Sequence, residues 1–227
     1  MLITFSCTNC QQTLEVGVET VGAQVECPVC RAVLIVPRKE LGPGVTISGF
    51  QIQQLLGAGG MGQVYLARQL SLDREIALKI LPAQMGLRPE AVQRFLSEVK
   101  LLARLEHPNI VTAFEAGEDA GILFLAMAYV RGESLAAKLK RTGPLPEAEA
   151  LPLIEKVASA LGYAWGQHQL LHRDIKPDNI LIDTHGEPKL VDLGIAKSLT
   201  SATSVTVSGM VMGTPNYMSP EQAQGLT

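Results

Sequence analysis

Four cysteines near the N-terminus have the residue types and spacing of a metal site. Cys7 and Cys10 form one Cys-x2-Cys pair, and Cys27 and Cys30 form a second pair after an interval of sixteen residues. A Cys-x2-Cys turn directs two thiolates at one ion, so two such turns complete the tetrahedral set of four sulfurs that Zn²⁺ binds. The spacing therefore predicts a structural zinc site.

The two halves of this N-terminal segment also repeat each other. Leu14 stands four residues after Cys10, as Leu34 does after Cys30, and each leucine lies in a short apolar run that predicts a strand. Paired cysteine turns that lead into strands resemble a zinc ribbon, which we expect over residues 1–37. Because so short a segment has little core, bound Zn²⁺ would supply much of its folding free energy.

Two other uses of paired cysteines compete with zinc. Disulfide bonds fit poorly with an N-terminus that lacks the basic and apolar regions of an export signal. A redox-active pair would need one Cys-x2-Cys motif near a βαβ pattern, which the sequence does not show here. Zinc is the interpretation that uses all four cysteines.

A run of glycines indicates a second site, for phosphate groups. The segment GAGGMGQV begins at Gly57 and includes Gly59, Gly60 and Gly62. A dinucleotide-binding fingerprint would continue directly into a helix, but the alternating residues QVYLARQL predict a strand. The glycines would then form a turn between antiparallel strands, where backbone N–H groups can approach phosphates closely. A purely structural hairpin would not need glycines at this spacing.

A lysine and a glutamate further along the chain form a candidate ion pair. Lys79 lies among apolar residues in the predicted strand EIALKIL, and a mostly buried lysine needs an anionic partner. Glu98 lies on the helix predicted from Pro89, three residues after Phe95, so it points toward the same inward side. A solvated helix carboxylate is the alternative for Glu98 alone.

The segment HRDIKPDN, residues 172–179, completes a series of motifs. It follows the glycine run, Lys79 and Glu98, and it precedes Asp192-Leu193-Gly194. From about residue 50 onward, the chain therefore resembles the eukaryotic-type (Hanks) serine/threonine protein kinases, and especially the bacterial ones. Leu193 stands where that family usually has phenylalanine.

The resemblance implies roles for the catalytic motifs. Asp174 would accept the proton of the substrate hydroxyl group, and Lys176 would bind the γ-phosphate of ATP. Asn179 and Asp192 carry hard oxygen ligands that suit Mg²⁺ or Mn²⁺. His172 would have a packing role beside Leu102 and Leu193 rather than a catalytic one.

The resemblance also implies where the nucleotide binds. Lys79 would bind the α- and β-phosphates and would be held by Glu98. Met127 would be the gatekeeper before a hinge at residues 128–131, whose backbone would bind adenine. The predicted nucleotide contacts are Leu56, Gly57, Gly59, Gly60, Gly62, Val64, Ala77, Lys79, Met127, Tyr129, Val130, Leu181 and Asp192.

The Ser- and Thr-rich residues between Gly194 and Gly213 resemble an activation loop. By that resemblance, Thr206 and Ser208 are the phosphorylation candidates, and Arg173 would supply a cation that pairs with a phosphate. Thr214 would contact Asp174 and favour Ser/Thr acceptors. A flexible polar loop is the plainer alternative.

Composition limits the partners. The 227 residues are 47% hydrophobic and 18% charged, with a net charge of −3, which is ordinary for a soluble globular protein. The acidic N-terminal module is a poor match for nucleic acid. No run approaches the ~18 apolar residues of a membrane span, so we expect a cytoplasmic protein unless an anchor is carried downstream.

These observations predict an α+β, bilobal protein-kinase-like fold preceded by a small zinc ribbon. A linker would cover residues 38–48 and the kinase domain 49–227. Within it we expect a β-rich N-lobe at 49–127, the hinge at 128–131 and an incomplete, mainly helical C-lobe at 132–227.

The predicted function is ATP-dependent transfer of the γ-phosphate to Ser/Thr of protein substrates, with autophosphorylation in a homodimer as a further candidate. One alternative is a non-catalytic ATP-binding scaffold or an inactive fragment. Small-molecule kinases of the aminoglycoside or choline type are another, but they lack the peptide-gripping segment GTPNYMSPE present at residues 213–221. Family members continue with further helices, so we expect these residues to be a poorly stable, weakly active part of a longer kinase.

Overall fold

The computed structural model describes residues 2–17, 20, 23–36, 41–59, 62–81, 89–119, 121–193 and 215–224. Four residues predicted to have functional roles lie outside this part of the chain: Gly60, Thr206, Ser208 and Thr214. Within the described residues, no helix has the length and apolar character needed to cross a membrane.

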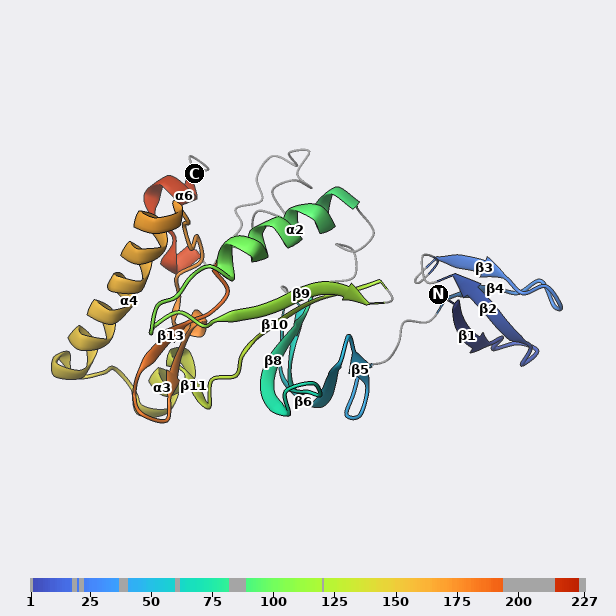
Figure 1. The fold of residues 1–227 in the computed structure, drawn as a ribbon, viewed down its shortest axis with the longest axis horizontal. Helices are drawn as coiled ribbons and strands as arrows, with labels where there is room; N and C mark the ends of the chain where they lie inside the picture. The colour runs from blue at the N-terminus through green and yellow to red at the C-terminus, as the bar shows by residue number, and fades with distance from the viewer. Residues whose placement is uncertain are drawn as a thin grey trace.

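The cysteine-containing segment forms two antiparallel hairpins. β1 (Leu2–Ser6) pairs with β2 (Thr13–Gly17), and β3 (Gln24–Glu26) pairs with β4 (Val33–Ile35). Figure 1 shows the hairpins together at the N-terminal end of the chain, in blue. Their shared core consists of Cys7, Leu14, Cys27 and Leu34. A strand does follow each cysteine pair, as the repeated leucines predict.

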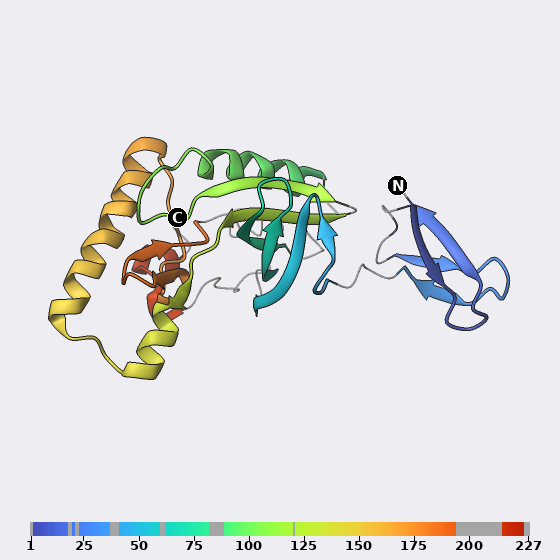
Figure 2. The ribbon, with the colours of Figure 1, turned by 60° about the horizontal axis from the view of Figure 1, so that its bottom comes forward.

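A six-stranded antiparallel sheet forms the next part of the chain. Its strands are ordered β5-β6-β7-β8-β10-β9, and helix α2 (Pro89–Leu102) lies along it in both Figure 1 and Figure 2. The strands are β5 (Thr46–Ile47), β6 (Phe50–Gly59), β7 (Gly62–Gln69), β8 (Arg74–Ile80), β9 (Ala113–Asp119) and β10 (Ile122–Ala128).

This sheet begins earlier than the sequence indicates. Thr46 and Ile47 pair with Gln51 and Phe50, and the Ile47 side chain is 1% exposed within the sheet's core. The second half of the predicted linker 38–48 therefore belongs to the sheet. The boundary was missed because two residues are too short a run to show alternation.

The remaining chain is mainly helical. Ser134 caps α3 (Leu135–Thr142) by accepting a hydrogen bond from the Ala137 backbone N–H, and α4 (Glu147–His168) packs through Leu153 and Val157. The other elements are β11 (Gly132–Ser134), η2 (Pro177–Asn179), β12 (Ile180–Asp183), β13 (Pro188–Leu190), η3 (Pro215–Tyr217) and α6 (Pro220–Ala223). A three-stranded sheet, ordered β11-β12-β13, contacts both helices.

One hydrophobic core joins the helical part to the sheet. It contains Val99 and Leu102 of α2, Leu125 of β10, Val157 of α4 and Leu193. The chain crosses from sheet to helices after β10, at the residues predicted as a hinge. The predicted α+β, bilobal architecture with a separate small cysteine module is confirmed.

Candidate active site and metal centres

A cavity of about 470 Å³ lies between the sheet and the helical part. Its walls contain many of the residues predicted to bind the nucleotide: Leu56, Gly57, Val64, Ala77, Met127, Tyr129, Val130, Leu181, Asn179 and Asp192. These residues come from β6, β7, β8, β10, the hinge, η2 (Pro177–Asn179), β12 and the segment that follows β13. The fold thus brings together at one cavity groups that are far apart in sequence.

Gly57, Gly59 and Gly62 lie at the paired ends of the antiparallel strands β6 and β7, so the glycine run falls between two strands, as predicted. Gly62 has a φ of +111°, and an added Cβ would lie 2.0 Å from the carbonyl oxygen of Ile80, so this position requires glycine. Gly57 and Gly59 have open space where a Cβ would lie. Space alone therefore does not require glycine at these two positions, and Gly57 lines the cavity.

Lys79 has a different partner from the one that the sequence predicts. Its side chain is buried in β8, and its Nζ atom lies 2.6 Å from Oδ1 of Asp192. The expected ion pair with Glu98 is not formed. A buried ammonium group needs a nearby anion, and Asp192 meets that need here.

Glu98 is half-buried on α2, between the buried residues Phe95 and Val99. One of its carboxylate oxygens is enclosed by the protein. The inward orientation that the helix pattern predicts is therefore present, although the contact with Lys79 is not. Helix periodicity gives the side of a helix, but it does not give the distance to a neighbouring strand.

The residues of the 172–179 motif converge on the Asp174 carboxylate. Lys176 Nζ lies 3.2 Å from Asp174 Oδ2. Asn179 Nδ2 donates hydrogen bonds to the Asp174 carbonyl at 2.8 Å and to Asp174 Oδ2 at 3.1 Å. Asp174 and Asn179 are both buried. The carboxylate is thus held in one place by a cation and an amide.

The Asn179 amide is oriented in a way that suits a cation. Because Nδ2 faces Asp174, the Oδ1 atom faces away from it. Asn179 and Asp192 line the same cavity, and carboxylate and amide oxygens are ligands that Mg²⁺ accepts. The donor set therefore fits the predicted magnesium site.

His172 is buried and is held from both sides of its ring. Its Nε2 atom lies 3.0 Å from the Val191 carbonyl oxygen, and its Nδ1 atom accepts a hydrogen bond from the Asp174 backbone N–H at 3.3 Å. This pattern fits a neutral ring protonated on Nε2. Burial lowers the pKa of His172 below its ordinary value. The ring therefore positions the backbone of Asp174.

We expect the stability of this region to depend on pH through His172. Because its pKa is lowered in the folded state, the unfolded state binds the proton more readily. The contribution of His172 to the free energy of unfolding is therefore fully present above the ordinary pKa of about 6.5. It is lost as pH falls from there toward the lowered pKa of the folded state. Urea unfolding between about pH 8 and about pH 5 should show a falling free energy of unfolding.

The matched variants for this prediction are His172→Asn and His185→Asn. His185 is exposed, so its replacement should leave the pH slope of the parent unchanged. Replacement of His172 should flatten the slope. An unchanged slope in His172→Asn would show that this ring is not the group that titrates.

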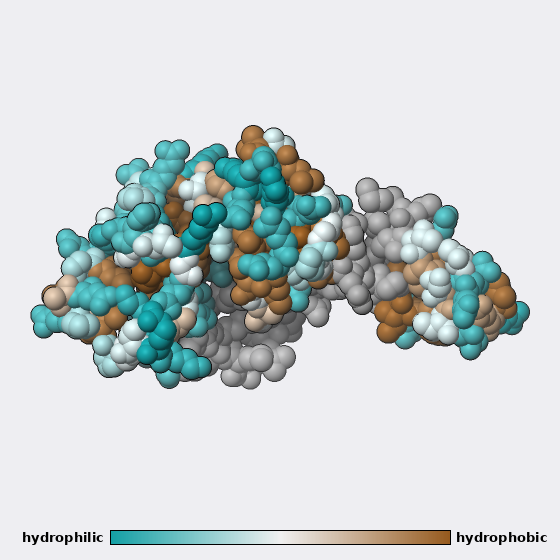
Figure 3. Space-filling view, turned by 90° about the horizontal axis from the view of Figure 1, so that it is seen from below, coloured by the Kyte–Doolittle hydropathy of each residue, from teal (hydrophilic) through white to brown (hydrophobic). Residues whose placement is uncertain are grey.

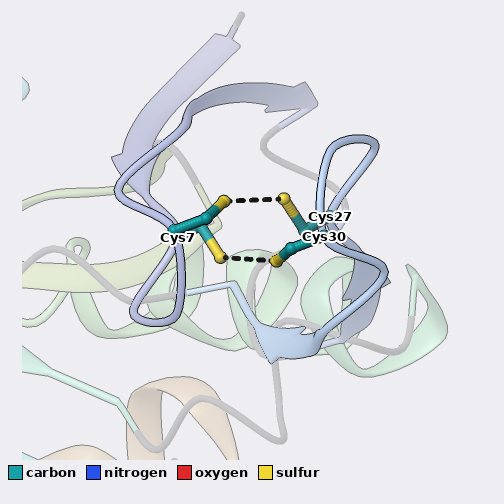
Figure 4. Close-up of side chains that lie close together, drawn as sticks. Cys7, Cys27 and Cys30 are labelled. Carbon is teal, nitrogen blue, oxygen red and sulfur yellow. Dashed lines mark hydrogen bonds between the residues drawn. The ribbon is translucent and has the colours of Figure 1, made fainter.

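The four cysteines form a compact cluster in the N-terminal module. All four sulfur atoms lie within 4.8 Å of one another, and the Cys7–Cys30 and Cys10–Cys27 sulfur pairs are each 3.6 Å apart (Figure 4). Four sulfurs placed about 2.3 Å from one tetrahedral Zn²⁺ would be about 3.8 Å apart. The cluster therefore fits one zinc ion, and these distances are too long for disulfide bonds.

The thiols of this cluster differ in acidity. A hydrogen bond with the Asn9 side chain lowers the pKa of Cys30 to about 6. At Cys10, a hydrogen bond with the Gln12 backbone lowers the pKa, but burial and the other sulfurs outweigh it and raise the pKa to about 12. Adjacent thiolates repel one another, so deprotonation of all four cysteines is favourable only when a divalent cation is bound between them.

Some residues of the cavity were not predicted from the sequence. Gly132, Glu133 and Ser134 line it from β11, and Asp178 and Val191 complete the wall. An added Cβ at Gly132 would lie 1.9 Å from the Ile182 carbonyl oxygen. One sequence feature could have indicated them. Gly132 follows the hinge, and Ser134, a residue type favoured at the N-cap, precedes the helical segment LAAKL.

A β-rich lobe, a helical lobe and a cavity at their hinge define the class as a bilobal, protein-kinase-like protein. The family model "Protein kinase domain" matches residues 50–226, and the chain belongs to this family. It is 45% identical over 183 residues to serine/threonine-protein kinase PrkC of Bacillus subtilis, covering 80% of this chain and 28% of that protein.

Two mycobacterial proteins give the same assignment. Serine/threonine-protein kinase PknA of Mycobacterium tuberculosis is 43% identical over 188 residues, which cover 80% of this chain and 43% of that protein. The crystal structure of the M. tuberculosis PknI kinase domain matches with a TM-score of 0.63 and 35% identity, covering 73% of this chain and 69% of that one. The chain thus spans less than half the length of these curated relatives.

Proposed function

We propose that this protein is an ATP-dependent protein serine/threonine kinase. The observation that carries the proposal is the Asp174 carboxylate, held by Lys176 and Asn179, close in the fold to a 470 Å³ cavity that Asn179 and Asp192 line. Phosphoryl transfer requires mainly positioning and neutralisation of spread negative charge. This arrangement supplies a base, Asp174, a cation, Lys176, and two oxygen ligands for a metal, from Asn179 and Asp192.

Each side chain would have a separate task in the transfer. Asp174 would orient the Ser/Thr hydroxyl group and accept its proton, while Lys176 would balance charge on the transferred phosphoryl group. Mg²⁺ or Mn²⁺, held by Asn179 and Asp192, would neutralise the phosphate oxygens. Lys79 would bind the α- and β-phosphates. Because Lys79 contacts Asp192 in this structure, nucleotide binding would require this ion pair to rearrange.

The cysteine module would be a structural zinc centre on the same chain. Its sulfurs have the number and spacing that tetrahedral zinc requires. Its described charged residues are Glu15, Glu26 and Arg31, which favours contacts with proteins over contacts with nucleic acid.

The experiment that tests the proposal is transfer of label from γ-labelled ATP to a basic protein in the presence of Mg²⁺. A kinase should place the label on serine or threonine, as acid hydrolysis and phosphoamino acid analysis would show. An ATP-binding scaffold would bind nucleotide and leave the basic protein unlabelled, which would contradict the proposal.

We also propose regulation through Thr206 and Ser208, by resemblance to bacterial kinases, since both lie outside the described residues. Arg173 adjoins Asp174, so a phosphate paired with Arg173 would act next to the base. The Thr206→Ala, Ser208→Ala double variant should lose about one charge-assisted contact at this position and show reduced autophosphorylation and activity. Parent-like values for both would contradict this regulation.

A further inference from the structure

The two hairpins of the cysteine module have the same backbone conformation around their cysteine turns. Cys27 in the second hairpin is equivalent to Cys7 in the first, 20 residues earlier in the chain. Both cysteines donate a backbone hydrogen bond to the carbonyl five residues later, at 2.8 and 2.9 Å. Gln11 and Arg31, at the same offset, both have a positive φ, of 62° and 57°. Each position of one hairpin can therefore be compared with its equivalent in the other.

The outward faces of the two hairpins differ at equivalent positions. Val33 and Ile35 of β4 are 66% and 67% exposed, while Leu34 between them is buried in the core. Their equivalents on β2 are Thr13 and Glu15, which are also exposed. The same backbone thus accommodates polar side chains at these positions, and folding does not require aliphatic ones.

A third position follows the same pattern. Val29 is 64% exposed, and its equivalent in the first hairpin is the exposed Asn9. A single exposed aliphatic residue needs no explanation. Here, however, three exposed polar residues of the first hairpin are all aliphatic at the equivalent positions of the second. Figure 3 shows hydrophobic surface on this small module. Val33 and Ile35 lie on the same face of β4, so a partner could contact both side chains together.

The backbone of β4 also has an edge available for pairing. Cys27 donates to the Ala32 carbonyl and Val36 donates to the Ala23 carbonyl, so the alternation of an antiparallel ladder turns the N–H and C=O groups of Val33 and Ile35 away from β3. In the described part of the chain, β3 is the only strand paired with β4. Val33 and Ile35 thus combine exposed side chains with backbone groups that pair with no other strand in the described residues.

We propose that β4 is a docking strand for an extended segment of a protein substrate, which adds as a further strand along Val33 and Ile35. Backbone hydrogen bonds would supply affinity, and aliphatic residues at alternate positions would supply selectivity. The exposed Glu26 on β3 lies directly opposite Val33, while the exposed Arg31 lies before β4 begins. A Lys or Arg of the added segment beside Val33 would therefore face the Glu26 carboxylate. The substrate assignment rests on the proposed kinase function.

The test measures binding of three labelled peptides to the zinc-loaded chain by fluorescence anisotropy. The probe is Thr-Val-Thr-Val-Thr-Lys, and its controls replace both valines with serine or the lysine with glutamate. The variant Val33→Thr, Ile35→Glu carries the residues of the first hairpin. The matched control, Thr13→Ser, Glu15→Gln, alters the equivalent positions. Zinc content and melting temperature verify that both variants fold.

We expect the parent and the matched control to bind the valine peptide, and the β4 variant to bind it at least about tenfold more weakly, since the contacts of two aliphatic side chains are lost. The serine and glutamate peptides should bind the parent more weakly than the probe. No binding by the parent, or equal binding by the β4 variant, would overturn the proposal. Self-association of the parent that the β4 variant abolishes would also overturn it, in favour of a second copy of the chain.

Phosphoryl transfer to a basic protein, measured in parallel, separates this proposal from the proposed function. Peptide binding without transfer would contradict the kinase function and leave the docking strand standing. Transfer without peptide binding would contradict the docking strand alone.

Discussion

The Asp174→Asn variant should lose about 10²–10⁴-fold in kcat, because its amide cannot accept the proton of the substrate hydroxyl group. The replacement keeps the size of the side chain and an oxygen that can accept the hydrogen bond from Asn179 Nδ2. The affinity for ATP should therefore change little. Initial rates of labelled phosphoryl transfer at several ATP concentrations give kcat and KM separately.

The matched control for Asp174→Asn is Glu155→Gln, which also removes one carboxylate. Glu155 is exposed on α4, so its replacement should leave kcat and KM at the parent values. If Asp174→Asn kept the parent kcat, or lost activity only through weaker ATP binding, the assignment of Asp174 as the base would be wrong.

Removal of zinc should unfold the cysteine module and leave the kinase lobes folded. Structural Zn²⁺ in small modules contributes about 10–16 kcal/mol of apparent binding free energy. The module's core contains two leucines besides the buried cysteines, which is too little to replace that contribution. Amide hydrogen exchange in peptides covering β1–β4 should approach the unfolded rate after chelation, while β6–β8 should stay protected.

The Cys27→Ser variant should behave like the chelated protein, because Cys27 is fully buried in this core. Ser6→Ala, an exposed change beside the cluster, should keep one zinc per chain and parent protection. Retained protection of β1–β4 after zinc removal would show that the fold of the module does not depend on the metal.

The sequence was most informative where chemistry restricts the residue type. The paired cysteines predicted the sulfur cluster because few other uses fit four cysteines at that spacing. The glycine run predicted the β6–β7 turn, and the close approach of Gly62 to the Ile80 carbonyl shows why no larger residue fits there. The hinge and the cavity walls were predicted through the family resemblance rather than through periodicity.

The sequence was least informative about distances between elements. Lys79 needs an anion, and the chain offers both Glu98 and Asp192 on other elements. Which of them lies nearer depends on how α2 packs against the sheet, and no local pattern encodes that packing. In the structure, Lys79 forms its ion pair with Asp192. In the same way, the exposure of Val33 and Ile35 became informative only when the register of both hairpins could be compared.

The measurement that tests the central claim most directly is a molar balance of the reaction. The chain is incubated with ATP, Mg²⁺ and a basic protein, and ADP is quantified together with phosphoserine and phosphothreonine. The proposed function predicts that each ADP formed is matched by one phosphorylated serine or threonine, and that EDTA stops both. ADP formed without phosphorylated serine or threonine, or no ADP at all, would contradict it.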